Sequence, residues 1–195
     1  MENRLKRQMK FALEIDKSKS VLRRTHLSNH GRRENDAEHA WHMAVMAYIL
    51  KEYANEPIDT AKVLIMCLIH DLVEIDAGDT FAYDEAAKLT EKVREEKAKN
   101  RIFSILPEDQ AKEFAELFEE FTQCATPEAK FANAMDNIQP LLLNDSNSGC
   151  DWKENDVSYD KVIQRQSKTK LGASTLYSMV EEILNKNVAK GNLRM

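Results

Sequence analysis

The sequence predicts an all-α fold. Only five glycines and four prolines interrupt its 195 residues, and the alternation of apolar and polar residues typical of strands is essentially absent. Hydrophobic residues make up 43% of the chain and charged residues 31%, which is typical of a globular protein. The length, with no repeat and no obvious linker, favours a single domain over residues 1–195.

The first three helices are placed by their apolar patterns and their ends. A helix is expected over about 4–16, followed by an irregular, basic stretch, SVLRRTHLSNHGRREN. The second helix begins near Asn35 or Asp36, either of which could cap it, and continues through AWHMAVMAYILKEYA. The third begins at Pro57 and ends near Gly78. It is apolar on every side, which indicates a central, buried helix.

Four further helices are expected in the rest of the chain. A strongly charged helix covers about 84–105, and another covers about 108–123. Thr126 and the proline after it open a helix through KFANAMDNIQPLLL. Residues 144–156 predict a loop, and a last amphipathic helix over about 157–190 is expected to pack on the domain.

Composition and charge exclude several classes of protein. A formal charge of −5 argues against binding to nucleic acid. No apolar stretch approaches the length of a membrane span, and the charged start MENRLKRQMK lacks the apolar core of a signal peptide. The three cysteines form no C-x-x-C pair and are too few for a disulfide framework. A cytoplasmic location is therefore expected.

Polar groups within otherwise apolar helices indicate a metal site. His39 lies on the second helix, His70 and Asp71 lie near the end of AKVLIMCLIHDLVEI, and Asp136 interrupts FANAMDNIQPLLL. Burying such groups is costly unless they are compensated, and one divalent ion where the helices meet would compensate all four. The alternative is that backbone groups or water satisfy each one separately. Imidazole and carboxylate ligands would admit Mn, Co, Fe, Ni, Zn or Mg as the divalent ion.

Glu74 is the first candidate for chemistry beside that ion. It follows His70 and Asp71 by one helical turn and therefore projects from the same side. A carboxylate near the ion but not bound to it suits a general base or a group that positions water. The alternative is an exposed residue at a helix end.

The order His39, His70–Asp71, Asp136 resembles the H…HD…D pattern of the HD-domain metal-dependent phosphohydrolases. The segments ENDAEH, LIHDLVEIDAGD, LPEDQAKEF and AKFANAMD are similar to the branch that contains bacterial 5'-deoxynucleotidases and the HD-domain-containing 2 proteins. The similarity covers roughly residues 20–145, the expected core. It implies an all-α domain of five core helices around one divalent ion, usually assembled as a homodimer.

The resemblance also implies roles for single residues. It makes Glu74 and Asp79 catalytic, and it assigns phosphate binding to Arg24, which lies about fifteen residues before His39. The implied reaction is hydrolysis of the 5'-phosphate of (deoxy)nucleoside monophosphates. The chain departs from the bacterial enzymes at Thr25, where they place a tryptophan, and this puts selectivity for deoxyribose in doubt.

Two alternatives stay open at this point. An HD-domain hydrolase could instead act on a nucleoside triphosphate, a cyclic or signalling nucleotide, or a non-nucleotide phosphate ester, although 195 residues leave little room for the larger pocket or added domains of such enzymes. A non-catalytic HD module would bind a nucleotide without hydrolysing it. Loss of Glu74 or of a metal ligand would be its signature, and all of those positions are present.

Overall fold

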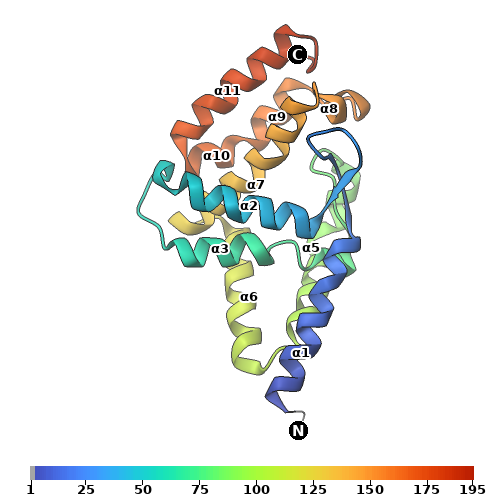
Figure 1. Ribbon diagram of the computed structural model, residues 1–195, viewed down its shortest axis with the longest axis vertical. Helices are drawn as coiled ribbons and strands as arrows, with labels where there is room; N and C mark the ends of the chain where they lie inside the picture. Colours follow the sequence, from blue (N-terminus) through green and yellow to red (C-terminus); the bar gives the residue numbers. More distant parts are fainter. Residues whose placement is uncertain (1–2) are drawn as a thin grey trace.

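The computed structural model describes residues 3–195, and its regular structure is almost entirely helical, as predicted (Figure 1). The elements follow in the order α1 (Arg4–Glu14), η1 (Ile15–Ser20), β1 (Leu22–His26), β2 (Arg33–Asn35), α2 (Asp36–Leu50), η2 (Lys51–Tyr53), α3 (Thr60–Ile69), α4 (Glu74–Ala77), α5 (Glu85–Phe103), α6 (Glu108–Gln123), α7 (Pro127–Ser146), α8 (Cys150–Glu154), α9 (Tyr159–Arg165), α10 (Ser167–Gly172) and α11 (Ser174–Ala189).

Helices α2, α3 and α7 form the centre of the molecule, with α1, α5 and α6 at the N-terminal end and α8 to α11 at the C-terminal end (Figure 1). The main hydrophobic cluster joins the centre to the C-terminal end, because Leu176, Val180 and Leu184 of α11 share it with Met43 and Val63. A second cluster fills the space between α1, α5, α6 and the turn after α3. Within residues 3–195, no helix combines the length and the apolar character that a membrane crossing requires.

The basic stretch expected to be irregular contains a short hairpin. Strands β1 and β2 pair antiparallel, with Leu22 opposite Asn35 and His26 opposite Arg33. The buried residues of the two strands are Arg23 and Glu34. Since both inward-facing side chains are charged, the hairpin carries no apolar alternation that could have predicted it.

The helix predicted from Pro57 to Gly78 is wrong as one continuous element. Asp59 caps α3, because its side chain accepts hydrogen bonds from the backbone N–H groups of Ala61 and Lys62. The helix ends at Ile69, and a turn leads into the four-residue α4. The apolar pattern continues through the turn because its residues pack in the second cluster, so the pattern did not reveal the break.

The C-terminal prediction needs two corrections. Residues 144–156 are not a loop throughout, since α7 extends to Ser146 and α8 follows Gly149, which has a φ of 67°. The single helix expected over 157–190 is three helices. A Cβ atom at Gly172 would collide with the carbonyl oxygen of Lys130, so α10 approaches α7 as closely as only glycine allows before the chain turns into α11.

Candidate metal centre and active site

Three helical elements bring together His39, His70 and Asp136. One ligand atom from each of these residues lies within 4.8 Å of the other two. His39 is fully buried on α2, and its Nε2 lies 3.2 Å from Asp136 Oδ1 on α7. His70 Nε2 lies 3.8 Å from the same oxygen. The structure thus places three of the four residues predicted as metal ligands in one cluster.

The fourth predicted ligand, Asp71, also reaches this cluster. His70 caps α3 and Asp71 follows it in the turn that leads to α4. Asp71 Oδ1 lies 3.1 Å from His70 Nε2, and Asp71 Oδ2 lies 3.8 Å from His39 Nε2. Both imidazoles and both carboxylates therefore face one point.

In both histidines Nδ1 contacts a hydrogen-bond acceptor, which leaves Nε2 to face the point where the four side chains meet. His70 Nδ1 lies 2.9 Å from the carbonyl oxygen of Cys67, which can only accept, so Nδ1 must carry a proton. His39 Nδ1 lies 2.9 Å from Gln139 Oε1, which is likewise an acceptor. Such partners on one ring nitrogen are typical of histidines that bind a metal through the other.

The arrangement fits a divalent cation. Within residues 3–195, His70 Nε2 is buried with no hydrogen-bond partner. Burial alone would lower the pKa of His70, but Asp71 and Asp136 raise it to about 10. The two carboxylates thus favour a positive charge at this nitrogen. Imidazole nitrogens and carboxylate oxygens are ordinary ligands of Mn, Co, Fe, Ni, Zn and Mg ions, so the residues present fit such an ion.

Arg23, which the sequence did not single out, lies among the carboxylates. It is only 8% exposed, and its Nη1 lies 2.7 Å from Asp71 Oδ2, 3.7 Å from Asp36 Oδ1 and 3.9 Å from Asp79 Oδ1. Its Nε lies 3.8 Å from Glu34 Oε2. Burial would lower the pKa of Arg23, but the charges of Asp71 first, and then of Glu74, Asp79 and Asp136, raise it overall. Arg23 is therefore a permanent cation that partly neutralises the site.

A second group of carboxylates lies beside the cluster. One oxygen from each of Asp36, Glu74 and Asp79 lies within 4.8 Å of the other two. Burial first, and the charge of Asp71 next, raise the pKa of Glu74 well above its usual range and that of Asp36 to about 8. Burial also raises the pKa of Asp79. Carboxylates with pKa values shifted in this direction are concentrated at functional sites.

Asp36 escaped the sequence analysis because it was one of two candidate caps. The structure assigns the cap to Asn35, whose side chain accepts from the backbone N–H of Glu38, while Glu38 accepts from that of Asn35. Asp36 is thereby free to turn inward, and it is only 1% exposed. By contrast, Asp76, which lies outside the matched pattern, pairs with Arg101 at the surface.

A cavity of about 540 Å³ opens above this site. Its lining includes His70, Asp71, Glu74, Asp79 and Asp136, and β1 adds Arg24 and Thr25. Arg24 is exposed on β1, next to the buried Arg23, because neighbouring strand residues face opposite sides. The predicted phosphate-binding residue therefore lines the same cavity as three of the four predicted metal ligands, His70, Asp71 and Asp136.

The C-terminal helices supply cations and an aromatic ring that the sequence analysis did not assign to the site. Lys161, Arg165 and Lys168 line the cavity, and Arg165 Nη2 lies 3.5 Å from Asp136 Oδ2. Trp152 of α8 also lines it, on the same cavity as Thr25. Lys161 and Arg165 lie on α9 and Lys168 lies on α10, so the single helix predicted for this segment did not assign them to the site.

The chain is similar to known proteins over most of its length. Residues 15–176 match the family described as HD domain. The chain is 34% identical to human 5'-deoxynucleotidase HDDC2 over 111 residues, which are 57% of this chain and 53% of that protein. It is 33% identical to 5'-deoxynucleotidase HDDC2 of Dictyostelium discoideum over 129 residues, which are 63% and 68% of the two chains. It spans about half the length of the human relative.

A solved structure is similar over the whole chain. The crystal structure of a protein described as "Predicted metal-dependent phosphohydrolase", from Magnetospirillum magnetotacticum MS-1, superposes with a TM-score of 0.96 at 45% sequence identity. The match covers 100% of this chain and 97% of that one. The resemblance inferred from His39, the His70–Asp71 pair and Asp136 is thus confirmed at the level of sequence family and of fold: the chain belongs to the HD-domain family.

Proposed function

We propose that the protein is a metal-dependent phosphohydrolase that removes the 5'-phosphate of (deoxy)nucleoside monophosphates. The observation that carries this proposal is the clustering of two imidazoles and two carboxylates at the edge of a cavity that also presents Arg24 and Arg165. A phosphate ester needs cations on its oxygens and an activated water at phosphorus. The names of the curated relatives, 5'-deoxynucleotidase, support the same substrate class.

His39, His70, Asp71 and Asp136 would hold one divalent ion. When bound, such an ion lowers the pKa of a water molecule and polarises a phosphoryl oxygen. The identity of the ion within the series Mn, Co, Fe, Ni, Zn and Mg is left to metal analysis. Arg23 keeps the Asp71 carboxylate in place through its 2.7 Å contact, so we assign Arg23 a positioning role.

Glu74 and Asp79 would move the protons of the reaction. Water attacks phosphorus while the bond from phosphorus to the 5'-oxygen breaks. Glu74 accepts a proton from the attacking water at its carboxylate, since its raised pKa favours proton uptake. Asp79, whose pKa is also raised, donates a proton to the leaving 5'-oxygen. Arg24 and Arg165 bind the non-bridging phosphate oxygens from two sides of the cavity.

The nucleoside would lie against aromatic side chains. Phe81, Tyr83 and Trp152 line the cavity, and their rings offer stacking surfaces for a base. Thr25 provides a hydroxyl group at the position where the bacterial relatives have a tryptophan. We therefore propose a nucleotide substrate without assigning a preference between ribose and deoxyribose.

Phosphate release tests the proposed function directly. Ribo- and deoxyribonucleoside monophosphates are incubated with the purified protein and Mn²⁺, Co²⁺ or Mg²⁺ in turn. Turnover of at least one monophosphate, lost after treatment with a chelator and restored by the metal, is the expected result. Parallel reactions with nucleoside triphosphates, cyclic nucleotides and a simple aryl phosphate test the other hydrolases. Absence of turnover for every monophosphate would contradict the proposal.

We further propose that residues 1–195 form one HD domain that assembles as a homodimer in the cytoplasm. The main hydrophobic cluster, shared between α2, α3, α7 and α11, supports the single domain. The free cysteines Cys67, Cys124 and Cys150 are in keeping with a reducing compartment, which cell fractionation would test. The formal charge of −5 speaks against nucleic acid as a partner.

The exposed apolar face of α2 supports the homodimer. It is formed together with the adjacent α3 by Trp41, Val45, Tyr48, Ile49, Ile65 and Leu68. Trp41 is 64% exposed, which is unfavourable for a large aromatic side chain unless a partner covers it. Trp41→Asp is expected to convert a dimer into a monomer in sedimentation experiments. Leu89→Asp, at an exposed position of α5, is the matched control and should sediment as the wild type does. A monomeric wild type would contradict the dimer.

A further inference from the structure

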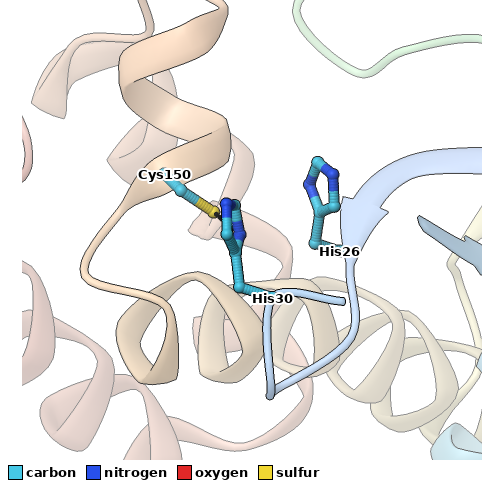
Figure 2. A group of neighbouring side chains, drawn as sticks. All are labelled: His26, His30 and Cys150. Carbon is cyan, nitrogen blue, oxygen red and sulfur yellow. Dashed lines mark hydrogen bonds between the residues drawn. The ribbon is translucent and has the colours of Figure 1, made fainter. Parts of the chain in front are cut away.

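A second group of metal-ligand side chains lies outside the cluster of His39, His70 and Asp136. His26 ends β1, His30 lies in the β1–β2 loop, and Cys150 begins α8. One ligand atom from each lies within 4.8 Å of the other two. Figure 2 shows Cys150 and His30 in contact, with the ring of His26 beside them. Cys150 Sγ lies 3.0 Å from His30 Nδ1, and the two imidazole rings are 4.8 Å apart between their centroids.

A buried carboxylate adjoins this group. Asp151 is only 3% exposed, and its Oδ1 lies 2.5 Å from His26 Nδ1. Its Oδ2 accepts a hydrogen bond of 3.0 Å from the backbone N–H of His26. Asp151 also follows Cys150 directly in the chain. His26 is therefore shared by two groups between the hairpin and α8, one with His30 and Cys150 and the other with Asp151 and Glu154.

This combination of side chains fits zinc. Zn²⁺ takes four ligands in its structural sites and accepts imidazole nitrogen, thiolate sulfur and carboxylate oxygen. A thiolate ligand distinguishes this group from the cluster in the cavity, which has only nitrogen and oxygen ligands. Hard cations such as Mg²⁺ and Ca²⁺ prefer all-oxygen sites and are not expected here.

The group does not resemble a catalytic thiol. Burial first, and the charge of Asp151 next, raise the pKa of Cys150 to about 11. A nucleophilic cysteine needs the opposite shift. The thiol proton would leave to solvent when a metal–sulfur bond forms, which is the ordinary exchange at zinc sites.

Two residues near the group have positive φ angles, which residues other than glycine rarely adopt. His30 has a φ of 54° and Ser148 a φ of 55°. Such conformations are costly and persist where the surroundings fix them. Asn147 Nδ2 also donates to the carbonyl oxygen of Leu27 at 2.7 Å, so the loop and the end of α7 are already tied together beside the group.

We propose that His26, His30 and Cys150 bind a structural Zn²⁺ ion, with Asp151 orienting the ring of His26 through its contact with Nδ1. The ion joins the β1–β2 loop to α8. It thereby fixes β1, which carries Arg24 and Thr25, against the C-terminal helices, which carry Arg165. The bound ion would therefore fix the distance between the two sides of the cavity.

Cobalt substitution separates this site from the one in the cavity. Cys150 is the only cysteine of either ligand set, so a thiolate-to-cobalt absorption band reports this site alone. The full-length protein is stripped with a chelator and titrated with Co²⁺, and the same protein is then titrated with Zn²⁺. We expect the band to appear with Co²⁺ and to disappear as Zn²⁺ displaces it. An Asp71→Asn background, which weakens the other site, should retain the band.

Two variants and one control make the test specific. Cys150→Ser should abolish the band and reduce bound zinc by one equivalent per chain. His30→Asn should weaken zinc binding by ~10-fold or more, the scale on which metal sites respond to lost partners. Asparagine tolerates the positive φ at position 30, so this variant removes the imidazole without new backbone strain.

Cys124→Ser is the control, since Cys124 is a free thiol in the αL cap after α6, and it should keep the band. Absence of the band in the wild type, or its survival in Cys150→Ser, would overturn the proposal. Hydrolysis of nucleotides plays no part in these measurements, so failure of the zinc site and failure of the proposed function are distinguishable.

Discussion

Glu74→Gln is expected to lower kcat by ~10²–10⁴-fold while the metal content of the protein stays unchanged. The carboxylate is the group best placed to accept a proton from water, because burial and Asp71 raise its pKa well above the usual range. Glutamine has nearly the same shape but cannot accept that proton. Steady-state kinetics with a nucleoside monophosphate and elemental analysis of the same preparation measure both effects.

Asp71→Asn is the matched comparison for Glu74→Gln. The amide would stand 3.1 Å from His70 Nε2, where a charged oxygen now lies, so the variant is expected to lose both metal and activity. The two variants differ in one readout, since only Asp71→Asn should lose metal. Equal metal loss in both would mean that Glu74 is itself a ligand, and full activity of Glu74→Gln would exclude it as the base.

Arg23→Met is expected to lower the free energy of unfolding by ~3–5 kcal/mol. Methionine keeps most of the apolar length of the side chain but removes the charge that lies 2.7 Å from Asp71 and 3.7 Å from Asp36. Those carboxylates would remain buried without their cation. Urea denaturation of chelator-treated protein measures the loss, because a bound ion would otherwise mask part of it.

The adjacent residue gives the control for Arg23. Arg24 is exposed, so Arg24→Met should change the free energy of unfolding by no more than about 0.5 kcal/mol. The same variant should raise KM, since Arg24 lines the cavity. The two neighbouring arginines thus separate stability from substrate binding. A larger loss of stability in Arg24→Met than in Arg23→Met would contradict these assignments.

The metal-ligand candidates could be predicted because each one breaks an apolar pattern. His39, Asp71 and Asp136 are polar groups inside hydrophobic segments, and such groups need compensation wherever the segments meet. The all-α class was equally accessible, since few glycines and prolines interrupt the helical patterns. Buried polar groups on helices that pack together are expected to meet, and the structure has these groups in one cluster.

Other residues of the site could not be predicted because residues of the same types are common at protein surfaces and helix ends. Arg23 lies in a basic stretch beside Arg24, and only the pleat of β1 decides which of the two is buried. From the sequence, Asp36 and Asn35 were equally suitable as the N-cap of α2. The reciprocal hydrogen bonds between Asn35 and Glu38 make Asn35 the cap. The cations of the C-terminal segment lie on α9 and α10, and α10 packs on the distant α7 at the close contact of Gly172 with Lys130. These are tertiary effects, which a local pattern does not carry.

The crowding of acidic groups around Arg23 has a consequence for metal binding. Four carboxylates, those of Glu34, Asp36, Asp71 and Asp79, lie within 4.0 Å of a single guanidinium. Burial raises the pKa of Asp36 to about 8 and also raises the pKa of Asp79. A dication bound beside these groups would favour their charged forms, so its binding is expected to release protons and to strengthen as the pH rises.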